Sequence, residues 1–203
     1  MKYKLTNTKV MNGMTLYQIQ ALKDFSNIKR GDLGGWIQSK KNLSQEGDCW
    51  VFGEATVYGE ATVYGNARVY GNAQVYDSAE VYGNARVWGK AQVSGEAQVS
   101  GEAQVYGHAQ VYGHAQVYGE ARVSGNAEVS GNAQVFDKAR VYGKAHIYGE
   151  AKVSGHIGTI KIDFNFGGDF NEILESLFHK DNLPILMGIH PDLDKIIQYK
   201  LSH

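Results

Sequence analysis

The stretch Ala103–Glu120 reads AQVYGHAQVYGHAQVYGE, which is three copies of one six-residue unit. Steps of six from Val51 to Val153 give 18 consecutive units, and each has Val or Ile at the same place. Ala stands two residues earlier in every unit except the first, where Cys49 takes its place. The chain therefore contains an array of hexads with no interruption.

The pattern inside each unit predicts one short strand and one bend. Ala and the β-branched residue are two positions apart, so they face one side of a strand while the polar residue between them faces the other. The Gly and the polar residue near the end of the unit are typical of a turn. A helix is excluded, because a Gly at every sixth position would cost about 1 kcal/mol each. Strands this short are stable when each stacks on a copy of itself, as in a parallel β-solenoid.

The unit resembles that of the hexapeptide-repeat proteins, in which a small residue follows an aliphatic one by four positions. Val81–Arg86, V-Y-G-N-A-R, fits both positions. It departs from the family at its second position, which here is aromatic or Ser, with Gly one place later. Gly34–Ala55 also resembles the lead-in of bacterial and prophage β-helix proteins named as transferases. The resemblance covers about residues 31–153 and implies a left-handed parallel β-helix of triangular section.

The predicted fold is an all-β solenoid between two smaller parts. With three hexads per coil, residues 49–154 form about six coils, which would be about 29 Å long at the usual strand spacing. Residues 1–48 are predicted to form an N-terminal β cap. In this cap Lys2–Thr6 and Met14–Leu22 form strands, and Asn12-Gly13 forms the hairpin turn between them.

Residues 155–203 are predicted to form a small α/β segment. Gly158–Phe166 alternates like a strand, and Asp169 with Glu172 three residues later is typical of a helix start. The helix would have an apolar stripe, formed by Phe170, Ile173, Leu174, Leu177 and Phe178. Such an apolar segment either folds over the last coil or mediates oligomerisation or partner binding. We expect the stripe to mediate oligomerisation, with a homodimer favoured over a trimer.

Composition limits the classes of function. The 20 basic and 21 acidic residues give a net charge of −1, which indicates neither nucleic acid nor membrane as a partner. The single cysteine, Cys49, allows no intramolecular disulfide, so a reducing compartment fits best. The sequence shows no signal-peptide pattern and no apolar run long enough for a membrane span, and we expect a cytoplasmic protein without a cofactor.

A period of 18 residues places one column of side chains above another along each face. The outward positions of the first face are Trp50, Arg68, Arg86, Gln104, Arg122 and Arg140. The positions that follow the β-branched residue on this face are Phe52, Tyr70, Trp88, Tyr106, Ser124 and Tyr142. The outward positions of the other two faces are mostly Gln, and we expected their amides to bond from coil to coil.

The arginines make the first face different, because stacked guanidinium groups repel one another. Contact with the adjacent rings would satisfy them, and so would an acidic or nucleic-acid partner. We predicted a partner-binding surface here, formed by Arg68, Arg86, Arg122, Arg140, Tyr70, Trp88, Tyr106 and Tyr142. The expected partner is a protein or nucleoprotein, and direct binding of nucleic acid is the weaker expectation.

Nothing in the hexads predicts a catalytic or metal site. The resemblance implies, for the many acyltransferases of the family, a trimer, a catalytic His and a loop that leaves the prism, yet no hexad here is interrupted. His108 stacks between Lys90 and Asn126, and His114 lies over Glu96, so neither column holds a metal-ligand set. His146 lies over Glu128 as a surface pair, and Cys49 is expected to be a core thiol.

Three functions remain open from the sequence. The favoured one is a non-enzymatic, protein-binding β-helix, in its narrow form a phage-encoded inhibitor of a host defence nucleoprotein such as a CRISPR effector. The first alternative is a trimeric, acyl-CoA-dependent acyltransferase. The second is a self-assembling structural rod, because the ends of β-helices can stack.

Overall fold

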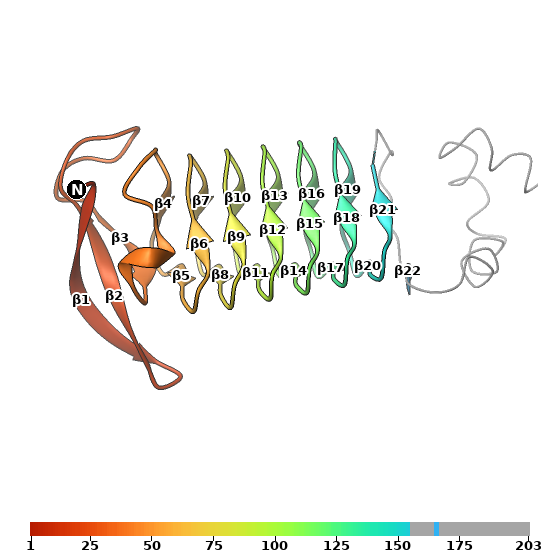
Figure 1. Cartoon of the computed structure of the whole chain (residues 1–203), viewed down its shortest axis with the longest axis horizontal. Helices are drawn as coiled ribbons and strands as arrows, with labels where there is room; N and C mark the ends of the chain where they lie inside the picture. The colour runs from red at the N-terminus through yellow and green to blue at the C-terminus, as the bar shows by residue number, and fades with distance from the viewer. Residues whose placement is uncertain (155–164, 167–203) are drawn as a thin grey trace, which may run out of the picture.

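The computed structural model describes residues 1–154 and 165–166, and these form an all-β parallel solenoid with almost no helix (Figure 1). Each hexad contributes a two-residue strand that contains the outward residue and the β-branched residue after it, as the alternation predicted. Each strand pairs in parallel with the strand 18 residues later, so that Arg86 lies beside Gln104 and Val87 beside Val105. Three hexads therefore complete one coil, which confirms the register predicted from the sequence.

The strands form three sheets, one for each face of the prism. The first face consists of β4 (Trp50–Val51), β7 (Arg68–Val69), β10 (Arg86–Val87), β13 (Gln104–Val105), β16 (Arg122–Val123) and β19 (Arg140–Val141). The third face consists of β6 (Thr62–Val63), β9 (Glu80–Val81), β12 (Gln98–Val99), β15 (Gln116–Val117), β18 (Gln134–Val135) and β21 (Lys152–Val153).

The second face is continuous with the N-terminal hairpin. Its repeat strands are β5 (Thr56–Val57), β8 (Gln74–Val75), β11 (Gln92–Val93), β14 (Gln110–Val111), β17 (Glu128–Val129) and β20 (His146–Ile147). β1 (Tyr3–Met11), β2 (Met14–Ala21) and β3 (Leu33–Ile37) extend this sheet at one end, and β22 (Asn165–Phe166) extends it at the other. The predicted hairpin is confirmed, with Met11 opposite Met14 and with Asn12 and Gly13 at φ angles of 51° and 77°.

The solenoid has about seven turns, which is one more than the hexads alone predicted. The additional turn comes before Cys49: β3 pairs in parallel with β5, and Leu43 forms a parallel bridge with Val63. A short 3-10 helix, η1 (Lys40–Asn42), lies between these two contacts. Leu43 follows Ile37 by six residues but precedes Val51 by eight, so this turn is out of phase with the hexads and the periodicity did not reveal it.

The core is two columns of small apolar side chains on each face. Ala109, Val111, Ala115 and Val117 are fully buried, as are their equivalents from Cys49 through Ile147. The corners between faces require a left-handed backbone: Gly101 has a φ angle of 65°, and a Cβ added there would lie 2.9 Å from the backbone nitrogen of Gly119. Glycine is therefore needed at this place both for its φ angle and for the close approach of the next coil.

The predicted left-handed winding rests on the resemblance alone and stays a prediction. The predicted helix and its apolar stripe of Phe170, Ile173, Leu174, Leu177 and Phe178 lie outside the described residues. No helix in the described part of the chain has the length and apolar character needed to cross a membrane.

Candidate binding face

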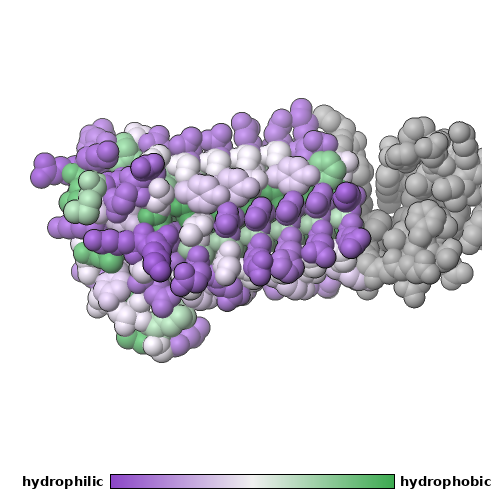
Figure 2. All heavy atoms as spheres, in the orientation of Figure 1, coloured by the Kyte–Doolittle hydropathy of each residue, from purple (hydrophilic) through white to green (hydrophobic). Residues whose placement is uncertain are grey.

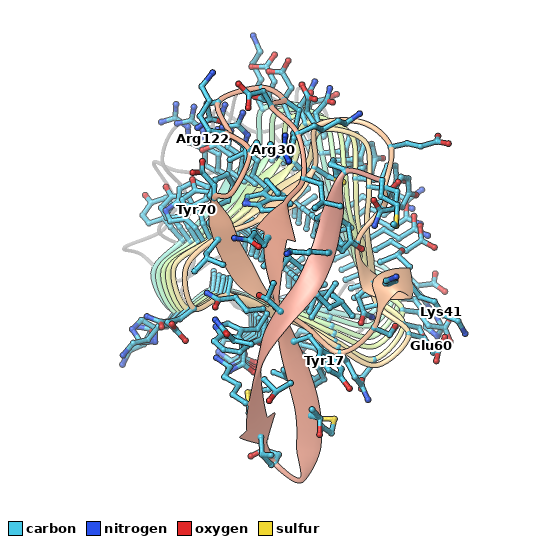
Figure 3. The ribbon with its side chains drawn as sticks, turned by 90° about the vertical axis from the view of Figure 1, so that its left-hand side faces the viewer. Tyr17, Arg30, Lys41, Glu60, Tyr70 and Arg122 are labelled. Carbon is cyan, nitrogen blue, oxygen red and sulfur yellow. The ribbon has the colours of Figure 1, made fainter. Side chains whose placement is uncertain are left out.

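The first face has the composition that the 18-residue period predicted. Backbone pairing places Arg68 beside Arg86, and Arg122 beside Arg140, with Gln104 between the two pairs. In the end-on view of Figure 3, Tyr70 and Arg122 project from one side of the prism, while Lys41 and Glu60 project from the other. We call one set of side chains on this sheet the arginine face. It consists of the outward residues of β7, β10, β13, β16 and β19, which are Arg68, Arg86, Gln104, Arg122 and Arg140, and of the residues that follow these strands, which are Tyr70, Trp88, Tyr106, Ser124 and Tyr142.

The arginine face begins at Arg68, because the N-terminal cap covers the first position of the column. Trp50 is only 1% exposed and packs edge-on against Phe25, with ring centroids 5.3 Å apart. Arg68 is half-buried next to this cap, and its guanidinium donates to the Ser26 hydroxyl at 2.9 Å. Arg86, Arg122 and Arg140 are exposed.

These arginines have no carboxylate partner within 4.0 Å among residues 1–154 and 165–166. The ion pairs in this part of the chain involve Lys9, Lys29, His114, Lys138 and His146. The cation–π contacts in it are made by lysines, with Lys2 over Phe25 and Lys9 over Trp36. The first alternative, in which the arginines are satisfied by the rings of their own face, is therefore not what the structure shows.

The rings stack on one another instead. Tyr70 and Trp88 are parallel within 3° with centroids 5.4 Å apart, and Trp88 and Tyr106 are parallel within 4° at 4.4 Å. Each ring thus covers the face of its neighbour and leaves its edge toward the arginine column. A ring edge carries positive partial charge, so it does not attract a guanidinium group. This explains why the predicted arginine–ring contacts are absent here.

Burial of the Tyr70 ring raises the pKa of its hydroxyl, and the charges of Arg86 and Arg68 oppose this increase. The column is open at one place, because Ser124 interrupts it between Tyr106 and Tyr142.

Two surface grooves lie along the arginine face. The first has a volume of about 330 Å³ and is lined by Asn66, Arg68, Asn84, Arg86, Glu102 and Gln104. The second has a volume of about 310 Å³ and is lined by Tyr106, Arg122, Ser124, Arg140 and Tyr142. Each groove thus contains one of the two arginine pairs.

Polar side chains of the other two faces bond with one another. On the second face, the Tyr58 hydroxyl donates to Gln74 at 3.4 Å, and the Tyr76 hydroxyl donates to Gln92 at 3.3 Å. Figure 2 shows a side of the solenoid on which rows of polar and aromatic side chains run along the long axis. The amide-to-amide ladders predicted for Gln do not form in the described residues, where no hydrogen bond joins two Gln side chains. The tyrosine of the coil before is the partner that the structure provides.

On the third face, the Tyr64 hydroxyl donates to Glu80 at 2.9 Å. Burial and the nearby Glu80 carboxylate together raise the pKa of Tyr64 to about 12. Here a carboxylate is satisfied within its own face, in contrast to the arginines of the first face.

The corner that follows the arginine face is also basic. From Asn72 to Lys144 it contains Lys90, His108 and Lys144, which are exposed, and no acidic residue. The other two corners contain the acidic residues Asp48, Glu60, Asp77, Glu96, Glu102, Glu120, Asp137 and Glu150, together with one lysine, Lys138. The small net charge of the chain therefore conceals a division into a basic side and acidic corners.

The histidines and the cysteine lie where the sequence placed them. His114 is 3.2 Å from Glu96, and His146 is 3.5 Å from Glu128, in exposed pairs. Cys49 is fully buried, and burial raises the pKa of its thiol, as expected of a core residue. No group of three or more His, Cys, Asp or Glu suited to a metal ion occurs among the residues that the structure describes.

Comparison with known proteins agrees with the geometry. The family model of the YdcK β-solenoid repeat matches residues 61–77, 79–95 and 115–131. The matched repeats support a hexapeptide-repeat-like β-helix family for this chain. The chain is also 40% identical over 50 residues to a protein of Escherichia coli (strain K12) named "Uncharacterized acetyltransferase YdcK". That match covers 25% of this chain and 15% of the relative, so the chain spans a small part of the relative's length.

Proposed function

We propose that this β-helix protein is a non-enzymatic scaffold that binds an acidic protein or nucleoprotein through its arginine face. The observation that supports the proposal most is the set of four arginines in register on one sheet, without a carboxylate partner in the described residues. Arginine forms bidentate bonds with carboxylate and phosphate groups, so such a face suits a partner that presents either.

The rigidity of the solenoid favours this function. The backbone nitrogen of the first residue of a strand bonds to the coil after it, as in the 2.8 Å bond from Gln104 to the Ala121 carbonyl. Side chains held at a regular spacing on such a frame lose little conformational freedom when a partner binds. The stacked rings from Tyr70 to Tyr106 would add a flat apolar strip beside the charges.

The test compares two variants with equal net charge. The first replaces Arg68, Arg86, Arg122 and Arg140 with Gln, the residue already present at Gln104. The control replaces Gln74, Gln92, Gln98 and Gln116, on the other two faces, with Glu. We expect tagged wild-type protein and the control to capture the same partner from a bacterial lysate, and the arginine variant to lose it. Equal capture of the partner by both variants would show that the partner does not bind through the arginine face.

The narrow form of this proposal is a phage-encoded inhibitor of a host defence nucleoprotein, such as a CRISPR effector. It stays a prediction from the prophage-like lead-in, as do the homodimer and the cytoplasmic location. Mass spectrometry of the captured partner tests the inhibitor directly, because the proposal requires a nucleoprotein component among the proteins that the arginine variant loses.

An acyl-CoA-dependent acyltransferase is the second candidate, supported by the name of the Escherichia coli relative and by the two His–Glu pairs. It requires a trimer with the histidines in clefts between prisms. Mass measurement in solution followed by titration with acetyl-CoA separates the two functions. A trimer that binds acetyl-CoA and loses this binding with His114→Asn or His146→Asn would favour the enzyme.

The structural rod is the third candidate, and it requires free ends. The N-terminal hairpin and the first turn cover one end, where Tyr3 donates to the Leu43 carbonyl at 2.7 Å. We therefore expect a single species in size-exclusion chromatography, whereas a ladder of sizes that grows with concentration would support assembly into rods.

A further inference from the structure

The aromatic column of the arginine face has a vacancy one ring wide. Tyr70, Trp88 and Tyr106 form a continuous stack, and Tyr142 continues the column after Ser124. Coils in a parallel sheet are about 4.8 Å apart, so Tyr106 and Tyr142 are separated by roughly 10 Å. A planar group at the level of Ser124 would lie about 5 Å from each ring, which is the spacing within the stack itself.

The vacancy is open. The groove of about 310 Å³ described above lies at this position, and its lining includes both tyrosines and Ser124. Its volume is at the lower end of the range for small-molecule sites, which suits a ligand of one ring system with a substituent.

Cationic groups border the vacancy on both sides. Arg122 and Arg140 line the groove, are exposed and have no carboxylate within 4.0 Å in the described part of the chain. Lys144, two residues after Tyr142, is exposed at the basic corner. Two adjacent guanidinium groups match an anion with several oxygens, above all a phosphate.

We propose that this vacancy binds one nucleotide unit, with its base between Tyr106 and Tyr142 and its phosphate on Arg122 and Arg140. The combination of a ring-sized slot and a phosphate-binding pair favours a nucleotide over an aliphatic anion, which would leave the rings unstacked. A free nucleotide and one unit of a single-stranded nucleic acid share this chemistry. The inference rests on the proposed function to the extent that both use the arginine face.

The chain contains its own controls for this site. Ser94 interrupts the aromatic column of the second face between Tyr76 and Tyr112 in the same way. The outward residues there are Gln92 and Gln110, in place of arginines. A slot that requires both rings and cations therefore exists at Ser124 and not at Ser94.

The experiment measures the binding of adenosine 5′-monophosphate and of an eight-residue oligoadenylate by equilibrium dialysis with the full chain. Ser124→Tyr fills the vacancy with the residue that the column uses elsewhere, so the variant should fold. We expect it to weaken binding roughly 10- to 100-fold, the range typical of a lost base–aromatic stack. Ser94→Tyr should leave binding unchanged.

Further measurements test the contributions of the base and of the phosphate to binding, and distinguish a free nucleotide from a nucleic-acid strand as the ligand. Arg122→Gln with Arg140→Gln should weaken nucleotide binding at least tenfold, and adenosine and ribose 5-phosphate should each bind more weakly than the nucleotide. Binding of the oligoadenylate with much weaker binding of the monophosphate would identify a nucleic-acid strand as the source, and comparable binding would identify a free nucleotide.

Three results would overturn the inference. One is no binding of either probe to the wild-type protein at millimolar concentration, and another is equal binding by Ser124→Tyr and Ser94→Tyr. Preference for the peptide glutamyl-tyrosine over both nucleotide probes would also overturn it, because the slot would then accept a protein side chain. If nucleotides fail to bind while partner capture still requires the arginines, the inference fails and the proposed function stands.

Discussion

The Nζ atom of Lys2 lies 3.0 Å from the carbonyl oxygen of Cys49 and donates a hydrogen bond to it in a buried position. The same ammonium group donates to the carbonyls of Glu46 and Gly47 at 3.2 and 3.3 Å. The first turn of a solenoid has no earlier coil to bond with these carbonyls. Lys2 therefore closes the N-terminal end with a side chain where every later coil uses its neighbour's backbone.

Removal of this ammonium group should destabilise the end of the solenoid. We expect Lys2→Met to lower the free energy of unfolding by about 2–4 kcal/mol, because three carbonyls lose a charged donor. Lys4→Met is the matched control, since Lys4 is exposed, and it should change little. Urea denaturation of both variants measures the difference, and equal stabilities would show that the end is closed in another way.

The corner glycines should tolerate only residues that accept a left-handed backbone. Gly101→Ala combines a φ angle of 65° with a Cβ placed 2.9 Å from the Gly119 nitrogen. We expect a loss of about 1–3 kcal/mol, the usual cost of such strain. Asp77 occupies an equivalent corner at a φ angle of 57°, and its carboxylate accepts from the Gly95 nitrogen at 3.1 Å.

Gly101→Asn therefore provides the comparison for Gly101→Ala, because Asn adopts the left-handed region more readily than Ala. It should unfold at a higher temperature than the alanine variant. The reverse order in thermal unfolding would mean that the corner is limited by space and not by its φ angle.

Alkaline pH should weaken the fold through its tyrosines. Burial is the main cause that raises the pKa of Tyr3 and of Tyr64 from 10.0 to about 12. A raised pKa means that the folded protein favours the neutral hydroxyl. The corresponding stability is complete below pH 10 and is lost as the pH rises toward 12.

We expect the urea midpoint to fall over this interval and to fall less in Tyr64→Phe, which has no phenol to ionise. A wild-type urea midpoint that stays constant from pH 10 to pH 12 would contradict the raised pKa values of Tyr3 and Tyr64.

The inward and outward positions of one hexad should respond oppositely to a large apolar residue. Ala109 is fully buried against the neighbouring coils, so Ala109→Leu should cost about 1–3 kcal/mol or prevent folding. Gln110, the next residue, is exposed, and Gln110→Leu should leave the stability nearly unchanged. Equal effects on the midpoint of urea unfolding would mean that the two side chains do not alternate between core and surface.

The sequence predicted the features that repeat. The pairing of Arg86 with Gln104 follows from the hexads and from the three-sided coil that the resemblance implies, because the outward residue alternates with the inward Ala and Val and three strands close a coil. The same 18-residue period predicted that the arginines of the first face lie above one another, and that its aromatic residues do so as well.

Features that occur once were not predictable in this way. The turn that contains Ile37 and Leu43 is out of phase with the hexads, because Leu43 lies eight residues before Val51, and nothing in the sequence marks Lys2 as buried. The partners of the outward side chains also differed from the expectation, since Tyr76 bonds to Gln92 of the next coil. This contact depends on the length of the two side chains. The 18-residue period shows only which residues lie above one another, so it does not predict the contact.

The most direct test of the binding face is modification of arginine by phenylglyoxal, read by mass spectrometry, with the captured partner present and absent. The account predicts that Arg86, Arg122 and Arg140 react in the free protein, where they are exposed, and are protected in the complex. Equal reaction of these three arginines in both states would contradict the proposal that this face binds the partner.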